Sequence, residues 1–264
     1  MVNDEMLKPR SLNPWYIRKE FEKKTGKLGH SSFLGSYASC LVASAWIQKH
    51  GQCALIPRMR YDSLGTRYSP QTHMPDYVRS RTLELIAEMI ERDNIDGSLA
   101  EVGVYKGHFS GQMNALLPSR KLYLFDTFEG FDESDKKRDN ESGFISGCDF
   151  VDKAFKDTNI DLVLSKMITP DMCVVKKGYF PESADNIEDT FALVSLDCDL
   201  YEPMYAGLEY FYPRLAKGGF MMLHEYNCPG FRGVKPAVAD YEKKYGQIPK
   251  IPIADWAGTL VITK

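Results

Sequence analysis

Two kinds of hydrophobic pattern alternate along the chain after residue 75. Short apolar runs predict strands at residues 98–104, 121–125, 172–175, 191–196, 219–223, 250–253 and 259–263. Apolar residues at helical spacing predict helices at residues 76–90, 110–117, 150–156, 182–187, 205–215 and 234–245. Runs such as Phe191–Val194 are continuously apolar, which suits strands buried on both faces of a parallel sheet. The pattern predicts an α/β fold, with a doubly wound, Rossmann-like sheet of seven strands.

The first 70 residues follow a different pattern and predict an accessory, mainly helical region. A helix is expected at Ser36–Lys49, followed by a loop with several prolines and glycines. We therefore expect two parts: residues 1–70, and a ligand-binding domain at residues 71–264. Within the second part, the charged connection 131–159 is expected to be either a lid over the ligand end of the sheet or a solvated loop.

Composition removes several classes of function. The chain has 264 residues, with 33 Lys and Arg against 36 Asp and Glu. This balance provides no basic surplus for nucleic-acid binding. The longest apolar-leaning stretch, Tyr37–Ile47, is shorter than the roughly 20 residues that span a bilayer. The six Cys residues form neither a disulfide framework nor paired zinc ligands. We expect a cytoplasmic protein that does not enter a membrane.

The end of the first predicted strand carries a glycine loop, Glu101–Ser110. A dinucleotide fingerprint would need glycine at positions 105 and 108, where Tyr105 and His108 stand instead. This difference weakens the interpretation of the chain as an NAD(P) oxidoreductase. The remaining pattern, an acid followed by Gly103 and Gly107, resembles motif I of S-adenosylmethionine-dependent methyltransferases.

The second predicted strand ends in Asp126, about 20 residues after the glycine loop. An acid at this strand end is placed to accept hydrogen bonds from both hydroxyls of a ribose. Capping a helix is the alternative role for this aspartate, and the two roles are compatible. The pattern therefore favours a ligand that contains a nucleoside.

Further acids follow the fourth and fifth predicted strands. Asp197 and Asp199 follow the fourth, and His224-Glu225 follows the fifth. Because neighbouring strands lie about 4.8 Å apart, Asp197 and Glu225 can share one Mg²⁺, with Asp199 or His224 as a third ligand. A bound cation or a carboxylate base makes a hydroxyl more nucleophilic. The zinc-protease motif fails at Cys228, and no nucleophile elbow of the hydrolase type occurs.

Several stretches together resemble the macrocin O-methyltransferase family, which methylates sugar hydroxyls. They are Tyr77–Glu84, Ala100–Gly107, Leu124–Phe131, Gly178–Ser183, Leu196–Pro203, His224–Asn227 and Phe231–Lys235. The resemblance covers the chain from about residue 70 to its end. It implies the class I methyltransferase fold, S-adenosylmethionine as methyl donor, Mg²⁺ as cofactor and a homodimer.

The resemblance also implies roles for individual residues. Donor contacts are expected from Met74, Glu101, Gly103, Tyr105, Gly107, Ser110, Asp126 and Thr127. The metal is carried onto Asp197, His224 and Glu225, and the catalytic base onto Asp197 or His224. Two adjacent aspartates can occur in the family where this chain has His224-Glu225, and Mg²⁺ prefers oxygen over nitrogen. The implied acceptor is a saccharide or a glycosylated small molecule. The remaining alternatives are an oxidoreductase, or a binding protein that keeps this fold without catalysis.

Overall fold

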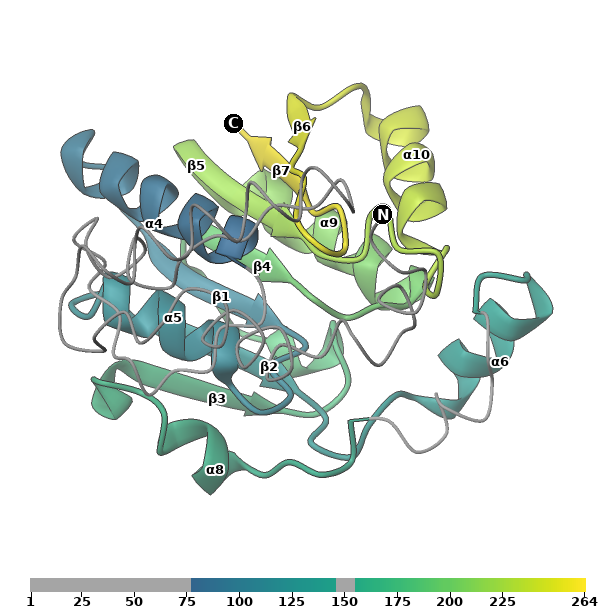
Figure 1. Ribbon diagram of the computed structural model, residues 1–264, viewed down its shortest axis with the longest axis horizontal. Helices are drawn as coiled ribbons and strands as arrows, with labels where there is room; N and C mark the ends of the chain where they lie inside the picture. Colours follow the sequence, from purple (N-terminus) through teal and green to yellow (C-terminus); the bar gives the residue numbers. More distant parts are fainter. Residues whose placement is uncertain (1–76, 146–154) are drawn as a thin grey trace, which may run out of the picture. The chain divides into compact units, whose positions relative to one another are not determined.

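The computed structural model of the protein describes residues 77–145 and 155–264. Within these ranges, seven strands form one sheet in the order β3-β2-β1-β4-β5-β7-β6 (Figure 1). The strands are β1 Ser98–Val102, β2 Leu122–Asp126, β3 Cys173–Lys177, β4 Phe191–Leu196, β5 Leu215–Leu223, β6 Lys250–Pro252 and β7 Leu260–Thr263. The helices are α4 Tyr77–Arg92, α5 His108–Leu116, α6 Glu133–Glu141, α8 Ile160–Leu164, α9 Tyr201–Arg214 and α10 Val234–Tyr245, with short 3-10 turns η3 Pro170–Met172 and η4 Glu182–Ala184.

The sheet is parallel from β3 to β5 and antiparallel at β7. β7 pairs with both β5 and β6 in antiparallel register. The parallel arrangement that the continuous apolar runs indicated therefore holds for the central strands, and β7 departs from it. Parallel neighbours need a long crossover, whereas only the short segment 253–259 joins β6 to β7. The strand order reverses between β1 and β4, which places the topological switch point there.

Helices cover both faces of the sheet. On one face α4 packs against α5 and β5, and α5 also contacts β2. On the other, α9 lies against β4 and β5, with α10 packed on α9. Alternate strand residues, such as Val102, Phe125 and Leu196, join the apolar cluster beneath α9 and α10. Because a strand alternates its side chains, neighbouring positions such as Glu101 face α4 and α5 instead.

The structure confirms all seven strands and most of the predicted helices. α10 has the predicted bounds, and it ends before Gly246, whose φ of 97° suits a helix terminator. Sequence patterns missed α6 and α8, which lie in and just after the charged connection. Of the helix predicted at 150–156, the structure describes only Phe155 and Lys156, and neither is helical.

Other expectations fall outside the described residues. These are the accessory region 1–70, its helix at Ser36–Lys49, and Met74. In the described part of the chain, none of the helices has the length and apolar character needed to cross a membrane.

Candidate active site

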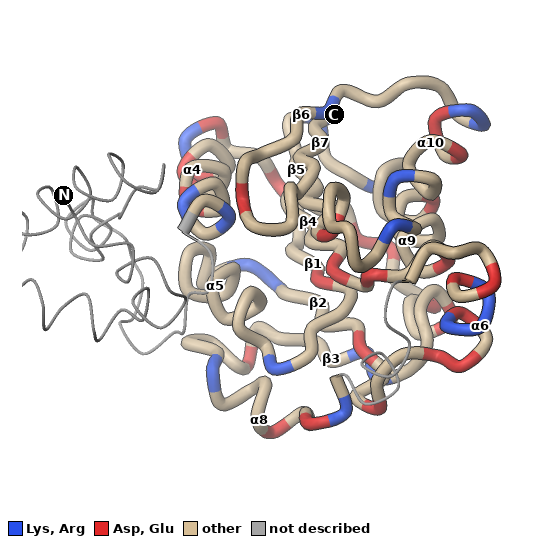
Figure 2. Tube along the Cα trace, turned by 45° about the vertical axis from the view of Figure 1, so that its right-hand side comes forward, with Lys and Arg blue, Asp and Glu red and all other residues tan. Residues whose placement is uncertain are grey.

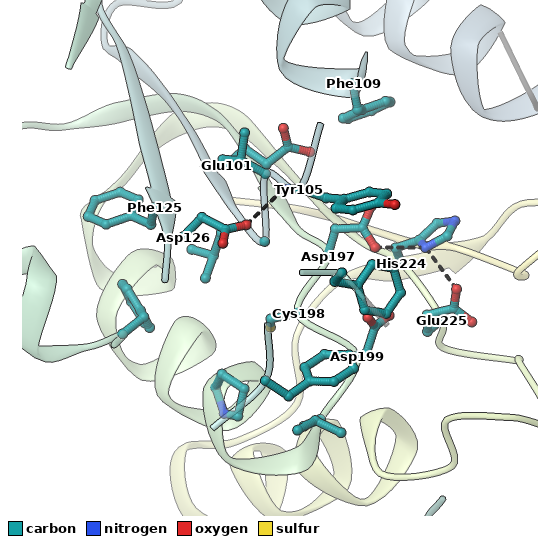
Figure 3. A pocket seen from close by; sticks show the side chains of 18 of the residues that line it. Glu101, Tyr105, Phe109, Phe125, Asp126, Asp197, Cys198, Asp199, His224 and Glu225 are labelled. Carbon is teal, nitrogen blue, oxygen red and sulfur yellow. Dashed lines mark hydrogen bonds and ion pairs between the residues drawn. The ribbon is translucent and has the colours of Figure 1, made fainter. Parts of the chain in front are cut away.

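The carboxyl ends of the central strands open into a cavity of about 690 Å³. Its wall includes Glu101, Asp126, Asp197 and Glu225, which come from the ends of four different strands. In Figure 3, Glu101 and Asp126 lie on one side of this space, and Asp197 and Glu225 on the other. Figure 2 shows acidic residues gathered where β1 and β4 end. The four acids that sequence patterns placed at strand ends therefore share one hollow.

Gly103 allows the ends of β1 and β4 to meet. Its φ is 85°, and a Cβ there would lie 2.0 Å from the backbone oxygen of Asp197. Gly107, with a φ of 72°, leaves space that the side chain of Val163 fills. Both constraints come from other parts of the chain. Glycine is needed at these two positions because another segment of the chain packs directly against the backbone. Gly103 lines the cavity, whereas Gly107 and Ser110 lie behind its wall.

Glu101 is a buried acid on the cavity wall. Only 1% of its surface is exposed, and its Oε2 accepts a hydrogen bond from the Ser110 hydroxyl. Burial and then the negative charge of Asp197 raise the pKa of Glu101 to about 8, although Ser110 and Arg79 act in the opposite direction. A buried carboxylate whose charge is costly favours a cationic ligand group beside it. Ser110 therefore supports Glu101 from behind.

Asp126 fastens the glycine loop to the end of β2. Its Oδ2 accepts a hydrogen bond from the backbone N–H of Tyr105 at 2.7 Å, and its Oδ1 accepts one from that of Phe128 at 2.6 Å. Burial raises the pKa of Asp126, while these backbone hydrogen bonds oppose the rise. Each carboxylate oxygen has two lone pairs, so both keep capacity for a ligand hydroxyl. Asp126 therefore links the glycine loop to the turn that follows β2, and it does not cap a helix.

Tyr105 and Thr127 shape the wall through contacts within the protein. The Tyr105 hydroxyl donates to Asp157 at 2.6 Å, and its ring packs edge-on against Phe155 with centroids 5.0 Å apart. The Thr127 hydroxyl donates to the backbone oxygen of Gly130 at 2.6 Å. Both residues line the cavity. Their side-chain hydrogen bonds hold the two loops in shape.

The opposite side of the cavity holds a compact group of charged side chains. His224 Nδ1 lies 2.8 Å from Asp197 Oδ1 and 3.1 Å from Glu225 Oε1 (Figure 3). The backbone N–H of His224 donates to the backbone oxygen of Leu196, which extends the pairing with β4 beyond the end of β5. Asp199 and Glu225 have φ of 61° and 56°. Such left-handed backbone in non-glycine residues carries strain and often occurs at functional sites.

Electrostatics make Asp197 and His224 an ion pair. Burial raises the pKa of Asp197, but His224 and Arg79 outweigh it and hold this pKa below its ordinary value. Burial lowers the pKa of His224, but Asp197 outweighs it and raises this pKa to about 10. Burial, Asp197 and Glu225 raise the pKa of Asp199 well above its usual range. At neutral pH the pair consists of a carboxylate and an imidazolium, next to an acid that resists ionisation.

Arg79 is a charged residue of the site to which the sequence analysis gave no role. Its Nη2 lies 3.0 Å from Asp197 Oδ2, and it lines the cavity from α4. A signal was present: Arg79 stands four residues before Leu83 and seven before Ile86, on the apolar stripe of an amphipathic helix. A charged side chain on a buried stripe needs a polar partner, and Asp197 provides it.

Aromatic side chains form much of the remaining wall. Phe131 packs on Phe155 and Phe231 with ring centroids 5.1 and 6.0 Å apart. Trp256, from the segment between β6 and β7, also borders the cavity and is 80% exposed. Phe131 and Phe155 belong to the charged connection, so part of this segment borders the site. These residues escaped prediction because isolated aromatics in loops carry no periodic pattern.

The acidic group has the spacing of ligands around a divalent cation. Asp197, Asp199 and His224 offer ligand atoms that all lie within 4.8 Å of one another. This set contains Asp199, whereas the sequence had favoured Glu225 as a partner of Asp197. Glu225 Oε2 is buried and has no hydrogen-bond partner in the described part of the chain. An imidazole nitrogen suits a borderline ion such as Mn²⁺ better than Mg²⁺.

The chain is similar in sequence to curated O-methyltransferases. One curated relative is the 8-demethyl-8-(2,3-dimethoxy-alpha-L-rhamnosyl)-tetracenomycin-C 4'-O-methyltransferase of Streptomyces olivaceus. It is 27% identical over 190 residues, which cover 69% of this chain and 70% of the relative. Another is the Mycinamicin III 3''-O-methyltransferase of Micromonospora griseorubida, 25% identical over 178 residues that cover 64% of this chain and 69% of the relative.

Solved structures show the same fold. The O-methyltransferase NovP aligns with a TM-score of 0.59 at 21% identity, covering 70% of this chain and 79% of that one. The calicheamicin methyltransferase CalS11 aligns with a TM-score of 0.57 at 18% identity, covering 89% and 95%. The fold is therefore that of class I O-methyltransferases. The model of the family described as Macrocin-O-methyltransferase (TylF) matches residues 70–261, most of the chain. The chain belongs to the macrocin O-methyltransferase family.

Proposed function

We propose that the protein transfers a methyl group from S-adenosylmethionine to a hydroxyl of a sugar or of a glycosylated small molecule. The observation that carries this proposal is the single cavity with two acidic sides. Glu101 and Asp126 line one side, and Asp197 lines the other with His224. Ligands of open α/β sheets bind at the carboxyl ends of the strands near the switch point, where this cavity lies.

Donor binding is assigned to the Glu101 side of the cavity. Glu101 would accept hydrogen bonds from the ammonium group of the donor, and Asp126 from the ribose hydroxyls, using its remaining lone pairs. Gly103, Tyr105 and Thr127 would form the wall around the donor. Gly107 and Ser110 would act indirectly, and a contact from Met74 stays a proposal. When bound, the donor supplies an activated methyl carbon on a positively charged sulfur.

Proton removal is assigned to the Asp197 side. The acceptor O–H gives its proton to Asp197, the oxygen forms a bond to the methyl carbon, and the electrons of the carbon–sulfur bond remain on sulfur. Asp197 is the favoured base because it is ionised in the resting protein, whereas His224 already carries a proton. His224 would hold the carboxylate in place and stabilise its charge. The reactants must be aligned, and a rigid pair on a strand end does this.

A divalent cation is a further part of the proposal. Asp197 and His224, with Asp199 or Glu225, would hold the ion, expected from the family resemblance to be Mg²⁺. Binding would require His224 to lose one proton, and Asp199 to ionise where it takes part, so metal affinity should increase with pH. It would supply charge that makes an acceptor hydroxyl more acidic. The donor set predicts that Mn²⁺ binds at least as well as Mg²⁺. A homodimer is likewise proposed, on the ground that symmetric association is common.

The aromatic wall supports a sugar-bearing acceptor. Phe131, Phe231 and Trp256 offer flat apolar surfaces next to the acidic group. Aromatic rings bury large areas, and the apolar face of a sugar ring packs well against them. The relative from Streptomyces olivaceus carries a rhamnosyl group in the name of its substrate. We therefore propose a rhamnose-type or similar deoxy sugar, free or attached, as the acceptor class.

Calorimetry with S-adenosylhomocysteine and with NAD⁺ tests the donor. We expect S-adenosylhomocysteine to bind and NAD⁺ not to bind, and the reverse result would identify an oxidoreductase. Transfer from labelled S-adenosylmethionine to a panel of rhamnosylated acceptors tests the reaction. Donor binding without transfer to any sugar acceptor would favour a non-catalytic binding protein and contradict the proposal.

A further inference from the structure

Polar side chains interrupt one buried face of the sheet where β1 and β4 lie side by side. Glu101 and Ser195 are register neighbours on these strands, and both are buried. Asp197 follows two residues after Ser195, so its side chain leaves the chain on the same side. Every such group needs a partner when it is removed from water. α4 and α5 cover this face and must supply the partners.

Arg79 of α4 contacts two of these three polar groups. Its Nη2 lies 3.0 Å from Asp197 Oδ2 and 3.5 Å from Ser195 Oγ. The guanidinium carbon stands 3.9 Å from the centre of the Phe109 ring, whose residue belongs to α5. Arg79 is only 8% exposed. A planar cation stacked on an aromatic ring and bonded at its edge is held in one orientation.

The two oxygens of Asp197 are therefore distinguished by their neighbours. Oδ2 faces Arg79, and Oδ1 faces His224. A carboxylate free to rotate would exchange these positions, whereas one fixed at both oxygens presents the same lone pairs at all times. The charge of Arg79 also lowers the pKa of Glu101, so the same cation acts on the acid of the donor side.

We propose that Arg79 is a positioning residue that fixes the Asp197 carboxylate for proton removal. The inference rests on the proposed methyl transfer. It assigns to α4, a helix that precedes the first strand, a part in the reaction. Phe109 serves as the support that keeps the guanidinium in its plane.

The test compares Arg79→Ala, Arg79→Lys and Phe109→Leu with a matched control. Arg81→Ala is the control, because Arg81 lies on the same helix and pairs with buried Glu84 at 2.6 Å, yet does not line the cavity. Full-length variants are measured for kcat, acceptor KM, S-adenosylhomocysteine affinity and Tm. We expect Arg79→Ala to lower kcat by about 100-fold, since a misplaced reacting group costs this much.

Other readouts separate positioning from a structural role. Acceptor KM should stay unchanged in Arg79→Ala, and S-adenosylhomocysteine affinity should fall far less than kcat, only through the pKa of Glu101. Arg79→Lys and Phe109→Leu should show intermediate losses of kcat. Guanidinium at millimolar concentration should restore part of the kcat of Arg79→Ala. Arg81→Ala should keep kcat even where its Tm falls as far as that of Arg79→Ala.

Three results would overturn the proposal. They are an unchanged kcat in Arg79→Ala, an equal loss of kcat in Arg81→Ala, and a loss of S-adenosylhomocysteine affinity in Arg79→Ala as large as the loss of kcat, which would make Arg79 a donor contact. Measurements on the wild type distinguish failure of the role of Arg79 from failure of the proposed function. If it neither binds S-adenosylhomocysteine nor methylates any acceptor, the proposed function fails and the role of Arg79 falls with it. If the wild type is active, only the role of Arg79 is at stake.

Discussion

The carboxylates on the two acidic sides of the cavity have different kinds of hydrogen-bonding and charged partners. On the donor side, a hydroxyl supports Glu101, and two backbone amides hold Asp126. On the reacting side, Asp197 lies between the charged groups of Arg79 and His224. Both sides are buried, so the difference lies in the charge of the partners.

This contrast indicates different tasks. A buried carboxyl group with neutral donors as its nearest partners resists ionisation, and its charge becomes favourable when a cation arrives. A carboxylate between two cations is already ionised and held in place, which suits a group that must act on a hydroxyl in one geometry. We therefore expect changes on the donor side to alter binding, and changes on the reacting side to alter turnover.

The largest effect is expected for Asp197→Asn. This substitution keeps the shape of the side chain but removes the proton acceptor, so kcat should fall by at least about 100-fold. Calorimetry should show nearly unchanged affinity for S-adenosylhomocysteine. Asp161→Asn, an exposed change on α8, provides the control. Wild-type turnover in Asp197→Asn would remove the contrast between the two sides.

A smaller effect, confined to binding, is expected for Glu101→Gln. Loss of a charge-assisted hydrogen bond to the donor ammonium should weaken S-adenosylhomocysteine binding by about 10- to 100-fold. At saturating donor, kcat should remain close to that of the wild type. Exposed Glu91→Gln on α4 should change neither quantity. If Glu101→Gln lowered kcat and left donor affinity intact, the assignment of the two sides would be reversed.

Donor affinity should also depend on pH through Glu101. Its pKa is raised to about 8, so below this pH the free protein holds a proton there that the donor ammonium must displace. Affinity should therefore increase with pH by at most about tenfold per unit and level off above pH 8. Calorimetry in buffers of different ionisation enthalpy measures the released proton. Glu101→Gln should abolish this release, and a proton release that persists would place the titrating group elsewhere.

The smallest effect concerns a buried acid that does not line the cavity. Asp139 of α6 accepts a hydrogen bond from the backbone N–H of Tyr201 at 3.0 Å, at the start of α9. Burial raises its pKa to about 6 from 3.8, so stability is full below the lower value and decreases as pH rises through the higher one. Asp139→Asn keeps the acceptor without the charge. After allowance for screening, it should stabilise the protein by about 1 kcal/mol at neutral pH.

Urea unfolding across this pH range measures the effect of Asp139→Asn. The advantage of the variant should disappear in acid, where the wild-type side chain is protonated. A variant less stable than the wild type at neutral pH would show that the charge of Asp139 is compensated in the fold.

Sequence patterns predicted the strands well because burial on both faces leaves a strong signal. β4 is buried at every position, and its continuous apolar run marked it clearly. α6 escaped prediction because Glu133–Glu141 is polar throughout. Its order comes from the Asp132 cap and from Asp135 and Asp139, which are buried despite their charge. Such tertiary contacts leave no periodic trace in a sequence.

The candidate site divides in the same way. Acids at strand ends were predictable, since the fold brings strand ends together at one edge. The contact between Arg79 and Asp197 was not, because the two residues are 118 positions apart and the stretch Tyr77–Glu84, which contains Arg79, carried no chemical role in the sequence. The sequence also placed Glu225 ahead of Asp199 as a partner of Asp197 in the metal set. Both residues have a positive φ, which changes the direction of their side chains, and a sequence pattern does not show this change.

A crystal structure with S-adenosylhomocysteine bound tests the central claim most directly. We predict the ammonium group beside Glu101, the ribose hydroxyls on Asp126, and the sulfur facing the pair of Asp197 and His224. A nucleoside seated away from these acids, or a sulfur turned from Asp197 with no open path between them, would contradict the account.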